Sequence, residues 1–401
     1  MKACVERLKR YVSYETTSDE GSDACPSSQG QVSFGALLVK ELKELGLTAV
    51  RQDAYGYVYA TLEKNAEGFP VIGLIAHMDT SPEAYGRLDD PQIIDYQGGE
   101  IPLNDQISLT ESEFPFLSDL RGQTLMTTRA ESLLGADDKA GIAIIMSVVE
   151  ELIHSKDTPH GTVQIAFTPD EEIGRGADHF DVEAFGADFA FTVDGGPAPG
   201  FEYETFNAAS AKIRIQGKNV HTGSAKNTMI SAVEIAMDLH SLLPCQMKAH
   251  FTEGREGFYH LLSLEGNVVE ARLSYLIREH DRAKFEKMKA YLTSAVALIN
   301  QKYGIEAALD LTDTYYNMKE KIEAHPEILD RALRAYQQVG LQAQVLPVRG
   351  GTDGAGLSFK GLPTPNLFTG GYNYHGIYEF ISLDQMAQAC AVVKAILTLK
   401  D

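Results

Sequence analysis

The sequence predicts a mixed α/β protein whose mostly parallel sheet is flanked by helices, with an inserted α+β domain that carries an open sheet. In the first two hundred residues, and again near the end of the chain, short apolar runs alternate with segments of helical periodicity. That alternation is typical of a parallel sheet covered by helices. Between these parts lie strands in which apolar and polar residues alternate. Such strands indicate a sheet with one face open to solvent.

The first part of the chain supplies most elements of the parallel sheet. Apolar spacing predicts a helix over 32–45 that ends at Gly46. Alternating β-forming residues on either side of 53–56 predict extended structure over 48–62. A buried strand, a helix and two further strands are predicted over 69–76, 141–153, 162–167 and 188–193.

The pattern changes near residue 207. Strands at 211–217 and 271–279 and helical stretches at 229–243 and 281–301 fit the order strand, helix, strand, strand, helix, strand. From about Tyr315 the first pattern returns, with a helix over 326–339, a strand over 342–346 and a closing helix over 384–399. We therefore expect one discontinuous domain, 1–206 and 314–401, interrupted by an inserted domain over 207–313.

Charge and cysteine content narrow the functional classes. The 401 residues include 35 Lys and Arg against 56 Asp and Glu, a formal net charge of −21. Such a chain repels phosphate backbones and anionic lipids, so we expect neither nucleic acid nor membrane as a partner. The four cysteines form no Cys-x-x-Cys motif, the N-terminus lacks the apolar core of a secretory signal, and no apolar run approaches membrane-spanning length. These features predict a cytoplasmic protein with reduced thiols.

Several of the notable polar residues follow directly on predicted strands. The full set is His77 and Asp79, Asp137, the pair Glu171 and Glu172, Asp194, and His375. The carboxyl ends of parallel strands form the crevice in which open α/β sheets bind ligands, so we expect these side chains to meet. Two imidazoles and several carboxylates without a thiolate suit zinc, with manganese or cobalt possible. One carboxylate can bridge two cations, and two such cations together activate a water molecule. The expected reaction is therefore a hydrolysis.

Local alternatives exist for the acidic pairs. Asp137 and Asp138 precede an apolar helix, where aspartates commonly cap the helix, and we expect Asp138 to do only that. Glu171 and Glu172 alone would be typical of a solvated turn. If both belong to a site, one can coordinate a cation while its neighbour remains free as a base.

Seven segments carry a resemblance to a known family. They are IAHMDTSPE, LLGADDKAGIA, AFTPDEEIGRGA, FTVDGG, GKNVHTGSAK, PVRGGTDGA and NLFTGGYNYHG. In sequence and order they resemble the motifs of the dinuclear-zinc aminopeptidase and carboxypeptidase family, essentially from end to end. The resemblance implies that His77 and Asp194 bind one zinc, that Glu172 and His375 bind the other, and that Asp137 bridges both.

The resemblance also implies the catalytic roles. Asp79 would orient the metal-binding His77, and Glu171 would be the general base that deprotonates the bridging water. His221, in the inserted domain, resembles the family's lid histidine, which steadies the oxyanion of the tetrahedral intermediate. Arg349 suits capture of a peptide carboxylate because guanidinium binds it bidentately, and Arg278 is a second candidate.

The expected function is that of a metallo-aminopeptidase that removes the N-terminal residue from short peptides, chiefly tripeptides. It would use two Zn²⁺ per chain and a hydroxide activated between them. The inserted domain would serve as a lid, and a homodimer is possible, since related enzymes often dimerise through that domain. Alternatives on the same site are a dipeptidase or an amidase of N-acyl amino acids. A more remote alternative is a non-catalytic peptide-binding protein.

Overall fold

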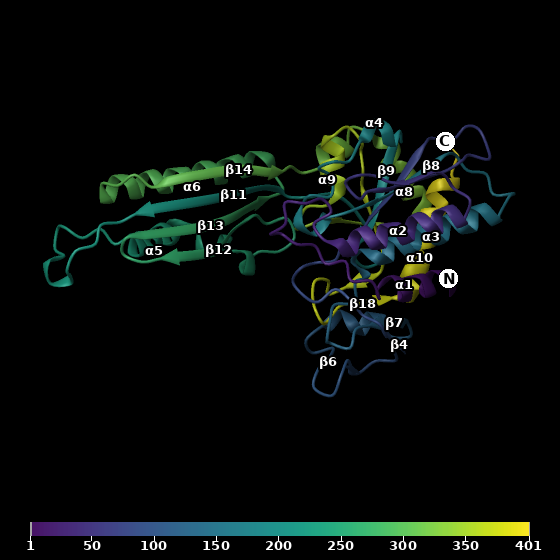
Figure 1. Ribbon diagram of the computed structural model, residues 1–401, viewed down its shortest axis with the longest axis horizontal. Helices are drawn as coiled ribbons and strands as arrows, with labels where there is room; N and C mark the ends of the chain where they lie inside the picture. The colour runs from purple at the N-terminus through teal and green to yellow at the C-terminus, as the bar shows by residue number, and fades with distance from the viewer. Residues whose placement is uncertain (1, 401) are drawn as a thin grey trace. The chain divides into compact units, whose positions relative to one another are not determined.

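The computed structural model describes residues 2–400, which divide into two compact units. The large unit comprises 2–203, 318–346 and 352–400, and the small unit comprises 204–317 and 347–351. Both are drawn in Figure 1, coloured by residue number. The sequence placed 347–351, with Arg349, in the discontinuous domain, whereas its contacts group it with the small unit.

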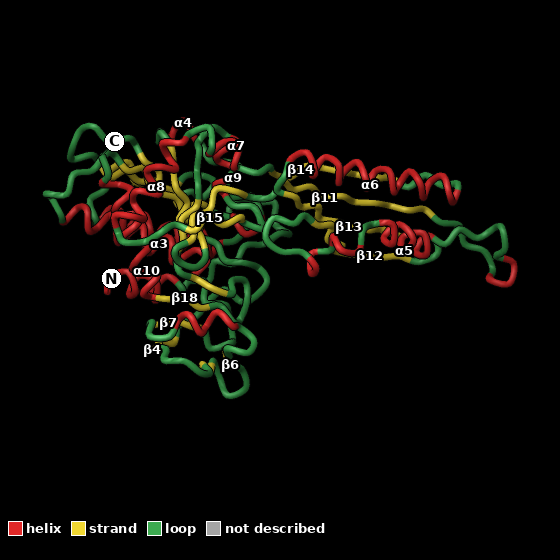
Figure 2. The backbone as a smooth tube through the Cα atoms, turned by 180° about the vertical axis from the view of Figure 1, so that it is seen from behind, coloured by secondary structure: helices red, strands yellow, loops and turns green. Residues whose placement is uncertain are grey.

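An eight-stranded sheet forms the centre of the large unit, with the order β1-β2-β8-β3-β9-β16-β10-β15 (Figure 2). The central strands β8, β3, β9 and β16 run parallel to one another, whereas β2 and β10 join them in antiparallel fashion. This sheet confirms the predicted fold class. In sheet order the strands are Thr48–Gln52, Val58–Leu62, Val163–Thr168, Ile72–His77, Phe189–Gly195, Asn366–Phe368, Gly200–Glu204 and Gln344–Pro347.

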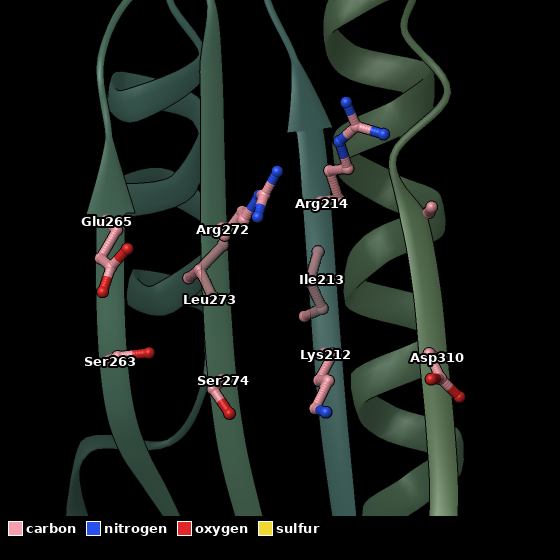
Figure 3. Close-up of a pocket in the computed structure, with 10 residues that line it drawn as sticks. Lys212, Ile213, Arg214, Ser263, Glu265, Arg272, Leu273, Ser274 and Asp310 are labelled. Atoms are coloured by element: carbon pink, nitrogen blue, oxygen red, sulfur yellow. The ribbon is translucent and has the colours of Figure 1, made fainter. Parts of the chain in front are cut away.

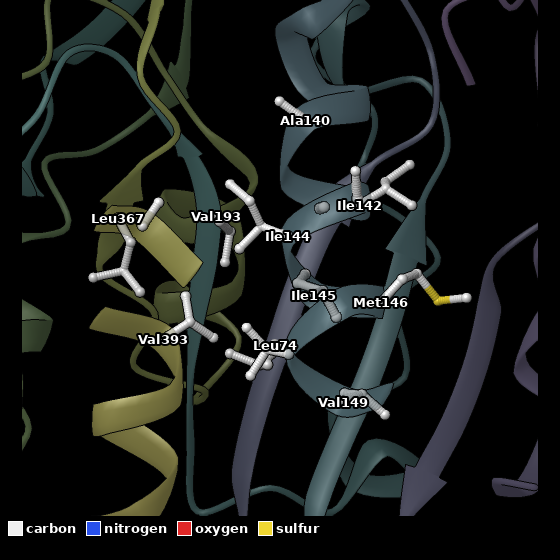
Figure 4. Packing of buried hydrophobic residues seen from close by; sticks show 14 of the residues in the cluster. Leu74, Ala140, Ile142, Ile144, Ile145, Met146, Val149, Val193, Leu367 and Val393 are labelled. Carbon is white, nitrogen blue, oxygen red and sulfur yellow. The ribbon is translucent and has the colours of Figure 1, made fainter. Parts of the chain in front are cut away.

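Helices cover this sheet. In chain order they are α1 (Lys2–Tyr11), α2 (Gln29–Glu44), α3 (Ala136–His154), α4 (Val182–Phe185), α7 (Lys319–Ile322), α8 (Pro326–Gln338), α9 (Asp353–Phe359) and α10 (Leu383–Thr398). Helix α3 packs on β3 and β9 and also contacts α1 and α10, so it is buried nearly all round. Figure 4 shows Ile144 of α3 beside Val193 of β9, with Val393 of α10 nearby. This packing fixes the start of α3 close to the ends of the parallel strands.

A smaller sheet lies elsewhere in the large unit. Its order is β17-β18-β7-β4, and a two-stranded hairpin, β5 and β6, accompanies it. In chain order these strands are Gln92–Asp95, Ile101–Pro102, Ser108–Leu109, Thr124–Thr127, Gly371–Tyr372 and Phe380–Ser382. No helix or strand is predicted over 83–133, because strands of two to four residues are too short to show a periodicity in the sequence.

The small unit has the predicted strand, helix, strand, strand, helix, strand order. Its antiparallel sheet runs β12-β13-β11-β14, and helices α5 and α6 pack against it. The elements are β11 (Asn207–Gln216), α5 (Ala232–Leu242), β12 (Phe258–Gly266), β13 (Glu270–Glu279), α6 (Arg282–Tyr303) and β14 (Ala308–Tyr315). The face opposite the helices is open, and Lys212, Arg272 and Asp310 line a hollow of about 340 Å³ on it (Figure 3).

Within residues 2–400, no helix is both long enough and apolar enough to cross a membrane.

Candidate metal centre

The predicted ligands meet at one edge of the central sheet. His77 is the last residue of β3, Glu171 and Glu172 follow β8, and Asp194 lies near the end of β9. Because β8, β3 and β9 are parallel neighbours, their carboxyl ends deliver these side chains to one place. Asp137 arrives from the start of α3, and His375 arrives from the loop after β17.

The five side chains form two clusters that share Asp137. In the first, Nε2 of His77 lies 2.9 Å from Oδ1 of Asp137 and 3.5 Å from Oδ1 of Asp194. In the second, Nε2 of His375 lies 2.9 Å from Oε2 of Glu172 and 3.2 Å from Oδ2 of Asp137. Each oxygen of Asp137 therefore faces a different histidine. That is the arrangement of a carboxylate placed between two cation positions.

The charge distribution also suits a cation. Burial, reinforced by the charge of Asp137, raises the pKa of Glu172 and of Asp194 to about 7. Hydrogen bonds to Asp137 and Glu172 raise the pKa of His375 to about 11. The side chain of Glu172 is 4% exposed, and its Oε1 has no hydrogen-bond partner among the residues described. Buried carboxylates that repel one another are stabilised in their ionised form by a nearby positive charge, such as a bound cation.

Asp79 connects the two halves of the site. The carboxylate is fully buried, and its Oδ1 lies 3.3 Å from Nδ1 of His77. The same carboxylate accepts the backbone N–H of Glu171 at 3.0 Å and that of Glu172 at 3.1 Å. The sequence predicted the contact with His77 but not the two backbone contacts. Asp79 thus holds a histidine ligand and the acidic pair in one arrangement.

The loop that carries the acidic pair is held by side chains. Asp170 has a left-handed φ of 57°, and its N–H donates to Oε1 of Gln31 at 3.1 Å. Its buried carboxylate accepts the N–H of Ser27 at 2.8 Å and Nε2 of Gln31 at 2.7 Å. Three consecutive backbone N–H groups, from Asp170 to Glu172, are therefore bound by side chains of other segments. Ser27, Gln31 and Asp170 were missed from the sequence, since no motif joins α2 to this loop.

Glu171 belongs to neither cluster. Its side chain is partly buried, and burial together with the charges of Asp194, Asp353 and Glu172 raises its pKa well above the usual range. A carboxylate beside the clusters, with an environment that favours the protonated form, is suited to accept and return a proton.

Asp138 does more than the predicted capping. Its Oδ1 accepts the N–H of Gly141 at 3.1 Å, which is the expected cap. Its Oδ2 accepts the N–H of His77 at 3.2 Å, so the same side chain also fixes the end of β3.

Two further residues near the clusters were also missed. Oε2 of Glu83 lies 3.4 Å from Nδ1 of His375, and Oδ1 of Asn366 accepts the N–H of Asp194 at 3.1 Å. Glu83 ends the segment IAHMDTSPE and Asn366 begins the segment NLFTGGYNYHG, but no role was predicted for either residue, and only the tertiary contacts reveal one.

The three predicted substrate-binding residues all lie in the small unit. His221 is exposed, and its Nδ1 accepts the N–H of Gly223 at 3.1 Å. The guanidinium of Arg278 lies 5.4 Å from the ring centre of Tyr315 and donates to the carbonyl of Ile277 at 3.1 Å. Their roles toward substrate stay predictions.

Arg349 is engaged within the small unit. Its guanidinium donates to the carbonyls of Gly254 at 2.9 Å and Glu256 at 3.0 Å, and to the hydroxyl of Thr252 at 2.7 Å. It also packs over the ring of Phe206, 5.2 Å from the centre. These contacts organise the 252–256 loop, and a bidentate grip on a carboxylate would require some of them to be exchanged.

Comparisons with known proteins identify the family of the chain. The model of peptidase family M20/M25/M40 matches residues 134–399. A protein named Peptidase T, from Caldanaerobacter subterraneus subsp. tengcongensis, is 52% identical over 404 residues, which cover 100% of this chain and 99% of that protein.

Solved structures share the fold. The aminopeptidase PepT of Bacillus cereus has a TM-score of 0.78 at 22% identity, covering 99% of this chain and 98% of its own. The YxeP protein of Bacillus subtilis, described as a dinuclear metal binding peptidase from the M20 family, has a TM-score of 0.67 at 15% identity, covering 99% and 97%. By its family match and its full-length relatives, this chain is an enzyme that belongs to peptidase family M20/M25/M40.

Proposed function

We propose that this chain is a dinuclear metallo-aminopeptidase that removes the N-terminal residue from short peptides, chiefly tripeptides. The relatives named Peptidase T and the aminopeptidase that shares the fold support this reading. The preference for tripeptides follows from the motif resemblance. The observation that carries the proposal is the placement of Asp137, whose two carboxylate oxygens face His77 and His375 at 2.9 and 3.2 Å.

The side chains fit two divalent cations. His77, Asp137 and Asp194 would hold one, and Asp137, Glu172 and His375 would hold the other. Oε1 of Glu172 supports this fit, because it is buried and has no hydrogen-bond partner among residues 2–400. Imidazole and carboxylate donors without thiolates favour zinc, with manganese or cobalt as substitutes.

Bound cations would supply a Lewis acid for the peptide carbonyl and would lower the pKa of an attacking water. Glu171 then takes a proton from that water as its oxygen attacks the carbonyl carbon. When the C–N bond breaks, Glu171 returns the proton to the leaving amine. Asp79 keeps Glu171 in place through the backbone N–H, and it orients the ring of His77 at the same time.

A peptide panel tests the substrate class. Metal-loaded enzyme is given di-, tri- and tetrapeptides of matched sequence, and the released residue is identified by mass. We expect the highest kcat/KM on the tripeptide and release of the N-terminal residue. Equal rates on all three lengths, or release from the C-terminus, would refute the proposal. A preference for the dipeptide would point to a dipeptidase on the same site.

Two matched variants test the roles within the acidic pair. Glu171→Gln is expected to retain bound metal and to lose turnover by about 10²–10⁴-fold, the usual contribution of a general base. Glu172→Gln is expected to lose metal as well as turnover. Near-wild-type turnover in the Glu171 variant would remove that residue as the base.

A further inference from the structure

A buried glutamate close to the metal centre has no role in the reaction described above. Glu379 is 1% exposed. Its Oε2 accepts the N–H of Gly135 at 2.8 Å, and its Oε1 accepts the N–H of Asp137 at 3.2 Å. The carboxylate therefore spans the loop that leads into α3.

The residues that lead into the regular part of α3 are not helical. Gly135 has a left-handed φ of 77°, and Asp137 and Asp138 have dihedral angles outside the helical range. N–H groups in such a stretch have no helical acceptor, and Glu379 accepts those of Gly135 and Asp137. Asp138 caps the helix through the N–H of Gly141, so the oxygens of Asp137 are free to face the two histidines.

The same glutamate also fixes the loop of His375. It lies four residues after that histidine, and its own N–H donates to the carbonyl of Gly376 at 3.1 Å. Strand β18, which pairs with β7, begins at the next residue, Phe380. Glu379 thus joins the two chain segments that carry Asp137 and His375. These residues belong to the second cluster together with Glu172.

We propose that Glu379 is a positioning residue that sets the affinity of the Asp137, Glu172 and His375 position for its divalent cation. His77 and Asp194 come from β3 and β9, which are held by the central sheet. Loss of the Glu379 carboxylate therefore lowers the cation affinity of the second cluster more than that of the first. The inference rests on the proposed dinuclear function.

The test measures cation binding directly. Metal-free protein is titrated with Co²⁺ by calorimetry, and the wild type is expected to bind two ions per chain in separable steps. His375→Ala identifies which step belongs to the second cluster. In Glu379→Gln we expect that step to weaken by about 10–100-fold, the usual effect of removing a partner behind a metal ligand. The other step, which shares Asp137 but keeps His77 and Asp194, is expected to weaken less.

A matched control removes a similar carboxylate elsewhere. Glu279 in the small unit is also buried and accepts a backbone N–H, from Asp281 at 2.9 Å. Glu279→Gln is expected to leave both binding steps as in the wild type. Glu379→Asp, which keeps the charge and shortens the side chain, is expected to show a smaller loss and serves if the amide variant does not fold.

Several results would overturn the proposal. These are two unchanged binding steps in Glu379→Gln, equal weakening of both steps, greater weakening of the step that His375→Ala retains, or loss of folding in both Glu379 variants. A wild type that binds fewer than two Co²⁺ would also overturn it. If the wild type binds two ions but cleaves no peptide, the proposed function fails and this inference stands. If it cleaves tripeptides while Glu379→Gln binds Co²⁺ normally, only this inference fails.

Discussion

Asp79→Asn tests whether the acidic pair depends on one buried carboxylate. In the wild type, each oxygen of Asp79 accepts one backbone N–H, from Glu171 at 3.0 Å and from Glu172 at 3.1 Å. The amide of asparagine keeps one acceptor and turns its NH₂ group toward the other N–H. One hydrogen bond to a charged acceptor is lost, which costs about 1.5–3 kcal/mol. At about 1.4 kcal/mol per tenfold, kcat/KM on a tripeptide should fall by about 10- to 150-fold.

The assay must separate this effect from metal loss, because Asp79 also orients His77. Rates are therefore compared at metal concentrations that saturate both proteins. Asp53→Asn is the matched control, since Asp53 also accepts two backbone N–H groups, from Tyr55 at 2.9 Å and Tyr57 at 3.0 Å, outside the clusters. The control should stay within twofold of the wild type. If Asp79→Asn also stays within threefold, the backbone contacts do not position the acidic pair for catalysis.

Three further predictions concern stability. Burial lowers the pKa of His280 to about 4 from 6.5, so the unfolded chain binds the proton more readily. The unfolding free energy should be unaffected by this residue above pH 6.5 and should fall by up to about 3 kcal/mol toward pH 4. His280→Leu should lose that part of the pH dependence. If urea titrations show that its unfolding free energy falls between pH 6.5 and pH 4 as much as that of the wild type, the prediction is wrong. Verified removal of metal should lower the melting temperature, since a bound ion contributes about 2.7 kcal/mol at a hundredfold excess of ion over Kd; an unchanged calorimetric transition would mean that the removed metal did not stabilise the fold. Ile144→Ala in α3, which is fully buried, should cost about 2–5 kcal/mol, and a loss below 1 kcal/mol in denaturant would mean that the site repacks.

The local pattern of the sequence predicts the polar edge of the sheet. His77, Glu172 and Asp194 each follow a run of strand-forming residues, and parallel strands bring such positions together whatever the rest of the fold does. The strand, helix, strand, strand, helix, strand order of the small unit is also predictable, because its alternating strands and helical stretches are long enough to be recognised one by one.

Contacts between distant segments are not predictable in this way. Nothing in the sequence shows that Asp79 accepts the backbone N–H groups of residues 171 and 172, or that Gln31 binds the loop before them. Arg349 illustrates the limit most clearly. The residue type predicts that Arg349 can bind a peptide carboxylate. It does not show that residues 347–351 group with the small unit, where the guanidinium donates to carbonyls of the 252–256 loop.

The discontinuity of the large unit has a consequence for synthesis of the chain on the ribosome. The four strands and helices α5 and α6 of the small unit lie between residues 207 and 315, so their sequence is complete before residues 318–346 and 352–400 of the large unit are translated. Strand β16 and His375 are made only afterwards, and His375 contributes to the second cluster. The sheet and helices of the small unit can therefore fold before the large unit is complete, since domains generally fold as units during synthesis. The second cation position cannot form until residue 375 has been translated.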